Sequence, residues 1–422
     1  MNRYTRIVAN TFILSLTSIL FAQVLTTGSI NGVVSGTNDL SLEGANVIAT
    51  HVPSGTSSGA TSRSDGSFNI PNLKVGGPYT VMVSYIGYSD SKISDIYISL
   101  GENRTVDFSL STEAIEMTAL DVVADKDINK TGAETRINNN AIQNTPTVSR
   151  GIFSITKQSS NVVDNNIAGR HPNYNSVKID GAILNDQFGL ATLPGGQAGT
   201  QPISLDAIEE IQLAIAPYDV RVSGFTGGSI NAVTRSGSNQ LSGSVYSYMK
   251  NQSLIGDYIE EDGTKNVYPD FTENISGARI SGAIIPDKLH YFLSAELSQT
   301  TTPNTVSLDP TSAQAFRGTE EEVMRVDSVL LNRYGIATGG AKQFDAKTPN
   351  TKLLAKVDYN INKNHRLSFR HNFVDAKDDI NARSTYNYYL GNAGYVFKSK
   401  QNSTMLHLYS SFGNKMSNAF TR

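Results

Sequence analysis

Residues 205–247 read LDAIEEIQLAIAPYDVRVSGFTGGSINAVTRSGSNQLSGSVYS, and the rest of the chain is organised around this stretch. Residues 205–208 are typical of a short helical start, and 211–216 form an apolar run of β type. A glycine-rich turn separates this run from a second β-type run at 230–234. Alternating residues at 241–249 follow. We therefore expect a small mixed-sheet unit that leads into a strand of another kind.

This stretch resembles the end of the plug domain and the first barrel strand of TonB-dependent outer-membrane receptors. The resemblance is carried by IEEI at 208–211 and GGSINAVTRSG at 227–237, and by NYNSVKIDG at 173–181. The Oar-like subgroup is the most similar, because APYDVR at 216–221 and GAIIPDKLHYF at 282–292 also fit. The resemblance implies a plug motif made of Asp180, Gly181, Gly227, Gly228, Asn231, Thr234 and Gly237.

Length and composition narrow the class of protein. A chain of 422 residues is long enough for two or three domains. The net charge is −3 and no long basic run is present, so the sequence lacks the positively charged patch that is typical of nucleic-acid-binding proteins. The absence of cysteine excludes disulfides, thiolate zinc sites and thiol nucleophiles. The six histidines are scattered, and no catalytic motif is present, so we expect no enzyme, no cofactor and no metal site.

Residues 1–22 have the pattern of a secretory signal peptide. Basic Arg3 and Arg6 precede an apolar core at 7–21, and the segment ends at Ala22. The core is shorter than the roughly 20 residues that a membrane-spanning helix needs, so we expect cleavage before Gln23 and not a retained anchor. Integration into a membrane would then require a β-barrel, and the expected location is the outer membrane.

Residues 23–112 alternate short β-type runs with turns, which predicts a small β-sandwich. We expect strands at 29–34, 45–50, 67–70, 79–85 and 105–110, and turns at 54–58, 65–66 and 76–78. The segment resembles the carboxypeptidase regulatory-like domain through GANV at 44–47, DGSF at 65–68 and YIGY at 85–88. Zinc peptidases need closely spaced His and Glu ligands. His51 is the only histidine in this segment, so the domain is expected to be non-catalytic.

Residues 113–130 form an acidic linker with one apolar island. In the family that the chain resembles, such a segment before the plug is the TonB box, an extended peptide that adds a strand to a partner sheet. The resemblance implies this role for Leu120, Asp121, Val122, Val123 and Ala124. A last strand of the sandwich is nearly as well supported by the residues themselves.

Residues 131–240 correspond to the plug in this comparison. We expect a short helix at 136–144, another beginning at Arg150, a strand at 173–179 and a hairpin turn at Asp180 and Gly181. Residues 193–201 are expected to form a loop. Gly227 and Gly228 are expected where the plug backbone approaches the barrel wall too closely for a Cβ atom.

Residues 241–422 show repeated two-residue alternation, typical of transmembrane β-strands. The apolar face of 288–297, 351–361 and 365–373 suits outer-membrane lipid, and the polar face suits a lumen. Residues 361–365 predict a short turn, and 300–350 predict an extracellular loop with a helix at 320–334. The fold class is thus mainly β: a sandwich, a small α+β plug and the first strands of an incomplete barrel. Far fewer than the ~22 strands of plugged transporters fit here, so we expect a truncated product.

The resemblance implies a receptor that imports or senses an unidentified extracellular ligand. Ligand binding outside would be coupled to the TonB complex in the periplasm, and no bond would be made or broken. The alternative is a surface adhesin or assembly scaffold that uses the sandwich and the loop at 300–350. Deleting residues 120–124 distinguishes the two, because adhesion should survive and uptake should not. Siderophore, glycan, peptide and cobalamin all remain open as ligands.

Overall fold

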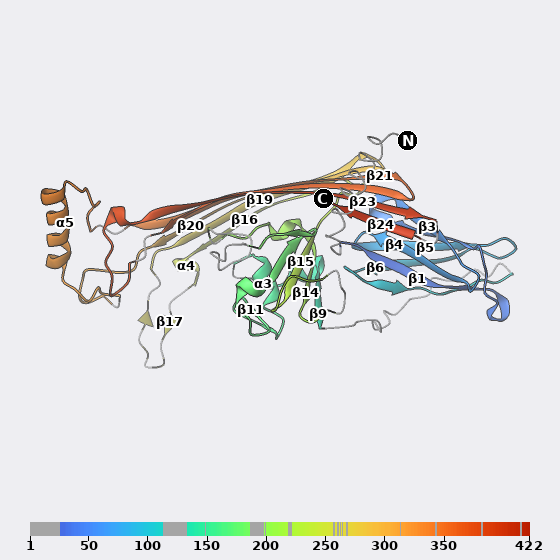
Figure 1. Ribbon diagram of the computed structural model, residues 1–422, viewed down its shortest axis with the longest axis horizontal. Helices are drawn as coiled ribbons and strands as arrows, with labels where there is room; N and C mark the ends of the chain where they lie inside the picture. The colour runs from blue at the N-terminus through green and yellow to red at the C-terminus, as the bar shows by residue number, and fades with distance from the viewer. Residues whose placement is uncertain are drawn as a thin grey trace, which may run out of the picture.

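The computed structural model describes residues 26–112, 133–147, 149–185, 198, 200–217, 222–255, 258–259, 261, 263, 265–266, 269–312, 314–341, 344–380, 383–413 and 416–422. The expected signal peptide and the TonB-box candidate at 120–124 lie outside these residues. Figure 1 shows a β-sandwich at one end of a long sheet, a small α+β unit under the middle of that sheet, and helix α5 at the other end. We call these parts the sandwich (β1–β8), the plug (β9–β15) and the barrel sheet (β16 and β19–β24).

The sandwich consists of two sheets packed face to face. One has the order β4-β1-β7, with β8 also paired to β1, and the other has the order β3-β2-β5-β6. Alternate residues such as Val47, Ala49, Val81 and Val83 are fully buried between them. The elements are β1 (Gly28–Ser35), η1 (Thr37–Asp39), β2 (Asn46–His51), η2 (Val52–Ser54), β3 (Thr56–Thr61), β4 (Ser67–Leu73), β5 (Gly76–Ser84), β6 (Ser91–Ile98), β7 (Asn103–Thr105) and β8 (Phe108–Ser109).

Edge strands account for most differences from the expected strands. Residues 56–61 form β3 and not a turn, and β6 has no counterpart among the expected strands. Both are edges of their sheet, held by backbone pairing to a single neighbour, so they need little apolar alternation. Residues 76–78 belong to β5 and not to a turn, and the expected strand at 105–110 is divided between β7 and β8.

The plug is built on a mixed five-stranded sheet with the order β13-β12-β15-β14-β9. Strand β15 runs parallel to β12 and antiparallel to β14, which confirms the expected mixed-sheet unit. All six residues of β15 are buried, because both faces of the sheet are covered. The elements are β9 (Glu134–Asn138), α2 (Asn139–Asn144), α3 (Ile152–Thr156), β10 (Val162–Val163), β11 (Asn166–Ile167), η3 (Pro172–Tyr174), β12 (Ser176–Ile179), β13 (Ala182–Ile183), η4 (Leu205–Ala207), β14 (Ile208–Ala214) and β15 (Ser229–Thr234).

The helix expected at 136–144 is shorter than predicted. Residues 134–138 extend as β9 along β14, and α2 begins at Asn139, where the Asn138 side chain accepts a hydrogen bond from Ala141 N–H. The helix expected near Arg150 is confirmed as α3, with Gly151 at its N-cap.

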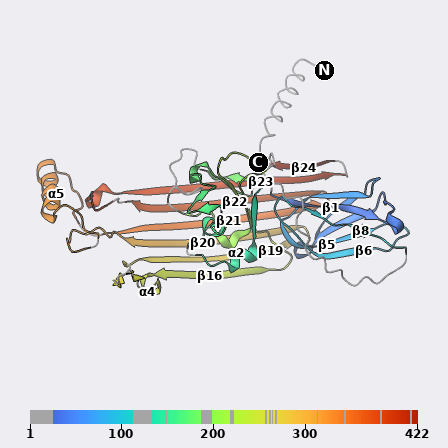
Figure 2. The ribbon, with the colours of Figure 1, turned by 90° about the horizontal axis from the view of Figure 1, so that it is seen from below.

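The barrel sheet has seven antiparallel strands in the order β16-β19-β20-β21-β22-β23-β24 among the described residues. The sheet is open, because β16 and β24 are its two edges. Figure 2 shows the strands side by side along the length of the molecule. The elements of this region are β16 (Ser242–Asn251), α4 (Gln252–Ile255), β17 (Tyr258–Ile259), β18 (Lys265–Asn266), β19 (Thr272–Ile285), β20 (Leu289–Pro303), α5 (Glu320–Tyr334), β21 (Asp345–Asn362), β22 (His365–Ile380), η5 (Gly391–Ala393), β23 (Tyr395–Phe412) and β24 (Met416–Thr421).

The two faces of the barrel sheet differ as the alternation predicted. On one face, Leu293 and Leu297 are 44% and 59% exposed, although both are large and apolar. On the other face, Glu296, Lys352 and Arg370 are 5%, 7% and 1% exposed, because the plug covers them. Charged side chains therefore lie inside and apolar side chains outside, which is the arrangement of a barrel wall in lipid.

The two ends of the barrel sheet also differ. Tight turns join β19 to β20 and β21 to β22, whereas residues 304–344 form a long loop between β20 and β21. This confirms the short turn near 361–365 and the helix at 320–334, which begins with a capping box between Thr319 and Glu322. The sandwich lies at the turn end and α5 at the loop end (Figure 1). Among the described residues, no helix combines the length and the apolar character needed to cross a membrane.

Candidate functional site

The contact between the plug and the barrel sheet has an apolar part. Phe292 of β20 is fully buried and Leu354 of β21 nearly so, and both belong to the hydrophobic core of the plug. On the inner face, Leu354 lies between Lys352 and Lys356 of its strand. The wall of the barrel sheet thus supplies side chains to the core of the domain that it covers.

Asp180 lies at the centre of a network of hydrogen bonds and ion pairs between the plug and the barrel sheet. It lies in the turn after β12, and its carboxylate accepts hydrogen bonds from Thr234 N–H (2.8 Å) and Thr234 Oγ1 (2.6 Å). Arg370 of β22 places Nε 3.2 Å from Asp180 Oδ2. Lys356 of β21 donates from Nζ to Thr234 O (3.0 Å), and His407 Nε2 of β23 lies 3.0 Å from the Asp180 carbonyl oxygen. Three barrel strands therefore meet Asp180 and its hydrogen-bond partner Thr234.

The charge state of Asp180 follows from these neighbours. Burial would raise the pKa of its carboxyl, but attraction by Lys356 and Arg370 and the hydrogen bonds from Thr234 outweigh burial and lower the pKa. Asp180 is therefore ionised and paired with a buried guanidinium. Removing either partner would leave the other charge buried without compensation.

Two further buried carboxylates link the plug to the barrel sheet. Glu296 of β20 accepts hydrogen bonds from Lys352 Nζ (2.7 Å) and from Ser204 Oγ of the plug (2.7 Å). Asp206 of the plug lies 2.8 Å from Arg279 Nε of β19. The plug is thus held through charges at several strands, in addition to the apolar contact.

The sandwich contacts the plug directly. Glu210 of β14 accepts a hydrogen bond at Oε1 from the Leu100 N–H of the sandwich (2.9 Å). Leu100 packs with Val233, Val75 and Val222 in a small apolar cluster. Burial raises the pKa of the Glu210 carboxyl to about 7. This contact therefore contains a carboxyl group that titrates near neutral pH.

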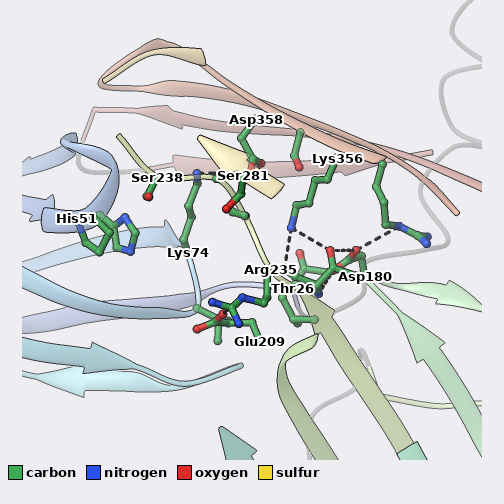
Figure 3. Close-up of a pocket in the computed structure, with 18 of the residues that line it drawn as sticks. Thr26, His51, Lys74, Asp180, Glu209, Arg235, Ser238, Ser281, Lys356 and Asp358 are labelled. Atoms are coloured by element: carbon green, nitrogen blue, oxygen red, sulfur yellow. Dashed lines mark hydrogen bonds and ion pairs between the residues drawn. The ribbon is translucent and has the colours of Figure 1, made fainter. Parts of the chain in front are cut away.

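The sandwich, the plug and the barrel sheet meet around a cavity of about 250 Å³. Figure 3 shows Lys74 of the sandwich reaching toward Asp358 of β21, while Lys356 points toward Asp180. The Lys74 Nζ to Asp358 Oδ2 distance is 3.7 Å. Burial lowers the pKa of Lys74 to about 8, and Asp358 opposes this shift. Charged side chains of all three parts line this cavity: Lys74 from the sandwich, Asp180 from the plug and Asp358 from the barrel sheet are among them.

The structure brings some residues of the expected plug motif together and separates others. Asp180 and Thr234 are hydrogen-bonded, and Gly181 follows in the same turn with a φ of 88°. Asn231 is buried in the middle of β15. The TonB-box candidate lies outside the described residues.

The expected reason for Gly227 and Gly228 is wrong. A Cβ atom on Gly227 would collide with Asn175 Oδ1, and one on Gly228 would collide with the Ile167 side chain. Both neighbours belong to the plug, so these glycines allow close packing within the plug. Gly237 is the residue that approaches the barrel wall, where a Cβ would collide with Tyr291 O.

Sequence reasoning placed Glu296, Lys356 and Arg370 on the inner face but did not find their plug partners. One signal was available. The barrel strands carry charged residues at inward positions, and the plug motif that precedes them contains a carboxylate, that of Asp180. The contacts of Lys74 and of Leu100 had no signal in the sequence, because they depend on how the sandwich is placed. No three His, Cys, Asp or Glu side chains gather as a metal site in the described ranges.

Comparison with known families agrees with this architecture. Residues 29–111 match the carboxypeptidase regulatory-like domain, and residues 233–328 match the outer membrane beta barrel domain. The TonB-dependent transporter Oar of Myxococcus xanthus is 29% identical over 199 residues, which cover 46% of this chain. The chain is similar to TonB-dependent outer-membrane receptors of the Oar type. Its matched part covers 18% of the length of Oar.

This protein is located in the outer membrane, as the match to the outer membrane beta barrel domain indicates. The relative is a transporter, and the expectation that this chain is not an enzyme agrees with that similarity. Among solved structures, a ferric enterobactin receptor mutant of Pseudomonas aeruginosa aligns with a TM-score of 0.47 and 14% identity, over 68% of this chain and 40% of the receptor. The outer membrane transporter YddB of Escherichia coli aligns with a TM-score of 0.45 and 13% identity, over 66% and 37%.

Proposed function

We propose that this protein is a TonB-dependent receptor that imports or senses an unidentified ligand across the outer membrane. The observation that supports this most is the plug itself, seated on the polar inner face of the barrel sheet through Asp180–Arg370 and Glu296–Ser204. A domain in that position obstructs the lumen, so a ligand can pass only if the plug rearranges. The loop end with α5 would face the medium, and the turn end with the sandwich would face the periplasm.

Leu120, Asp121, Val122, Val123 and Ala124 are the TonB box in this proposal. The segment that contains them connects the sandwich to β9, which is an edge strand of the plug sheet and pairs only with β14. A pull on this segment would reach β9 before any inner strand. The edge position of β9 supports a route from a periplasmic partner to plug rearrangement.

The test uses the full chain inserted in outer membranes and the purified periplasmic domain of TonB from the same bacterium as the probe. We expect either Val122→Pro or Val123→Pro to abolish binding of that domain. Successive N–H groups of an added strand point to opposite sides, so one of these two residues donates to the partner sheet and proline removes that donor. Asn129→Pro, in the same linker but outside the box, is the matched control. Heat-modifiable migration in gels checks that all variants fold and insert.

Each result has a separate meaning. Wild-type binding of TonB by Val122→Pro and Val123→Pro would place the box elsewhere. Failure of the unaltered chain to bind TonB would contradict the proposed function as a whole. Deleting residues 120–124 addresses the adhesin alternative, because attachment of cells to a surface should then persist.

A further inference from the structure

The cavity between the sandwich, the plug and the barrel sheet has an unbalanced charge. Its lining contains five cationic side chains and three carboxylates, with its histidines counted as neutral. The three carboxylates are each used by one ion pair: Lys74 with Asp358, Arg235 with Glu209, and Arg370 with Asp180. Lys356 and Arg366 have no ion pair of their own within the described residues. Two positive charges are therefore in excess.

Several donors in this lining also lack hydrogen-bond partners among the described residues: Lys74 Nζ, Arg366 Nε and Arg370 NH1. The Lys74 side chain is only 9% exposed, and its distance of 3.7 Å to Asp358 is too long for a hydrogen bond. The Arg366 guanidinium lies over the Tyr409 ring, 4.5 Å from its centroid. Stacking uses the face of the guanidinium and leaves its N–H edge available.

A lining with excess positive charge and unpaired donors is energetically unfavourable unless an anion balances the charge and accepts the hydrogen bonds. Buried charges are normally paired, and an unmade hydrogen bond to a buried charged donor is costly. An oxyanion would provide both charge and acceptor atoms, and charge-assisted bonds of this kind are strong. The cavity of about 250 Å³ has room for such an ion together with several waters of ~30 Å³ each. Hydroxyl groups of Ser236, Ser238, Ser281 and Ser368 also line it.

We propose that this cavity is a binding site for a small oxyanion of the phosphate type, held jointly by Lys74 of the sandwich and by Lys356, Arg366 and Arg370 of the barrel sheet. The bound ion would join the sandwich to the barrel sheet beside the plug turn that carries Asp180. It would therefore act as a removable link between the periplasmic module and the wall of the receptor.

The test is calorimetric titration of the full chain, purified in maltoside detergent free of phosphate and sulfate, with inorganic phosphate. We expect saturable binding by the unaltered chain and at least about tenfold weaker binding by Lys74→Met, which removes one charge-assisted contact. Lys92→Met is the matched control, because Lys92 is an exposed lysine of the same sandwich. Arg366→Met is a second variant that changes the barrel side only.

The outcomes separate the alternatives. Equal binding by Lys74→Met, Arg366→Met and the unaltered chain would overturn the proposal. It would also be overturned if the unaltered chain bound neither phosphate nor short-chain phosphatidic acid at concentrations up to about 10 mM. A parallel titration with monomeric short-chain phosphatidic acid identifies the source of the oxyanion. Binding of that lipid alone, lost in Lys74→Met, would support the site and assign it to a lipid headgroup. If Lys74→Met fails to fold, Arg366→Met alone decides.

Discussion

Asp180 has a φ of 45°, a left-handed conformation that Asn also adopts readily. Asp180→Asn therefore keeps the backbone of the turn, removes the negative charge and replaces one acceptor oxygen with an NH2 donor. Arg370, whose side chain is 1% exposed, would then be left as a buried charge without its partner. We expect the free energy of local opening around β12 and β15 to fall by about 3 kcal/mol, at the low end for a broken buried pair. Hydrogen–deuterium exchange of the β15 amides measures this.

Asp164→Asn is the control for that experiment. Asp164 is an exposed residue of the plug, also with a positive φ, so the substitution matches the chemistry and the backbone conformation. Unchanged exchange of β15 in Asp180→Asn would mean that the ion pair with Arg370 contributes little. Faster exchange in both variants would point to a general loss of plug stability.

Glu210 makes the contact between sandwich and plug dependent on pH. Its pKa is raised from 4.5 to about 7 chiefly by burial, with further contributions from Glu102 and Glu209, against the Leu100 N–H and Arg136. Because the pKa is raised in the folded state, the associated stability is present below about pH 4.5. It is lost as the pH rises through about 7. The loss is on the order of 3 kcal/mol, since one pKa unit corresponds to about 1.4 kcal/mol.

Glu210→Gln should remove that dependence, because an amide stays neutral at every pH while it can still accept the Leu100 N–H. We expect the variant to have a higher thermal midpoint than the unaltered chain at pH 8 and a similar midpoint at pH 4.5. The difference between the two curves isolates Glu210 from other titrating groups. Glu43→Gln, at an exposed position of the sandwich, should follow the unaltered chain. Parallel curves for Glu210→Gln and the unaltered chain would contradict this interpretation.

At the scale of elements, the sequence predicted strands where one face is buried and the other is not. Strands β20, β21 and β22 alternate between an apolar and a polar face, and the residues at 288–297, 351–361 and 365–373 revealed both the strands and their inner face. Helix α5 could be predicted as well, since Thr319 and Glu322 form a capping box before it. In these elements local pattern and tertiary environment agree.

Other elements carry no local signal because their stability comes from a neighbour. Strand β3 reads TSSGAT and is held by backbone pairing with β2, and β9 is held in the same way by β14. The partners of Asp180 show a related limit. The inward position of Arg370 could be predicted from alternation, but its pairing with a residue 190 positions earlier depends on how the plug is seated.

At the scale of the whole molecule, the placement of the sandwich is the arrangement that no sequence pattern indicated. It lies against the turn between β19 and β20 and against the segment before β16. In that segment the Asn239 N–H donates to Pro53 O (2.8 Å), and Asn239 Nδ2 donates to Asp287 Oδ1 of the turn (2.7 Å). A Cβ atom on Gly55 would lie 2.7 Å from Asp287 Cγ in that turn. Because Asp287 Cβ is one bond away from Cγ, the Cβ atoms of the two positions are close enough for a disulfide to be attempted. The native chain has no cysteine, so introduced thiols can be followed without interference.

We therefore expect the double variant Gly55→Cys and Asp287→Cys to form a disulfide under mild oxidation in intact membranes. Gly55 has a φ of 64°, so a cysteine there costs about 1–2 kcal/mol, which the rest of the sandwich should tolerate. Thiol alkylation followed by mass spectrometry measures the loss of both free thiols. The control pair is Gly87→Cys with Asp287→Cys, because Gly87 also has a positive φ but has no atom within 4 Å of its Cβ position. Equal thiol reactivity in the two pairs would show that the sandwich is not docked at this turn in the membrane, whereas selective loss in the first pair would establish that contact.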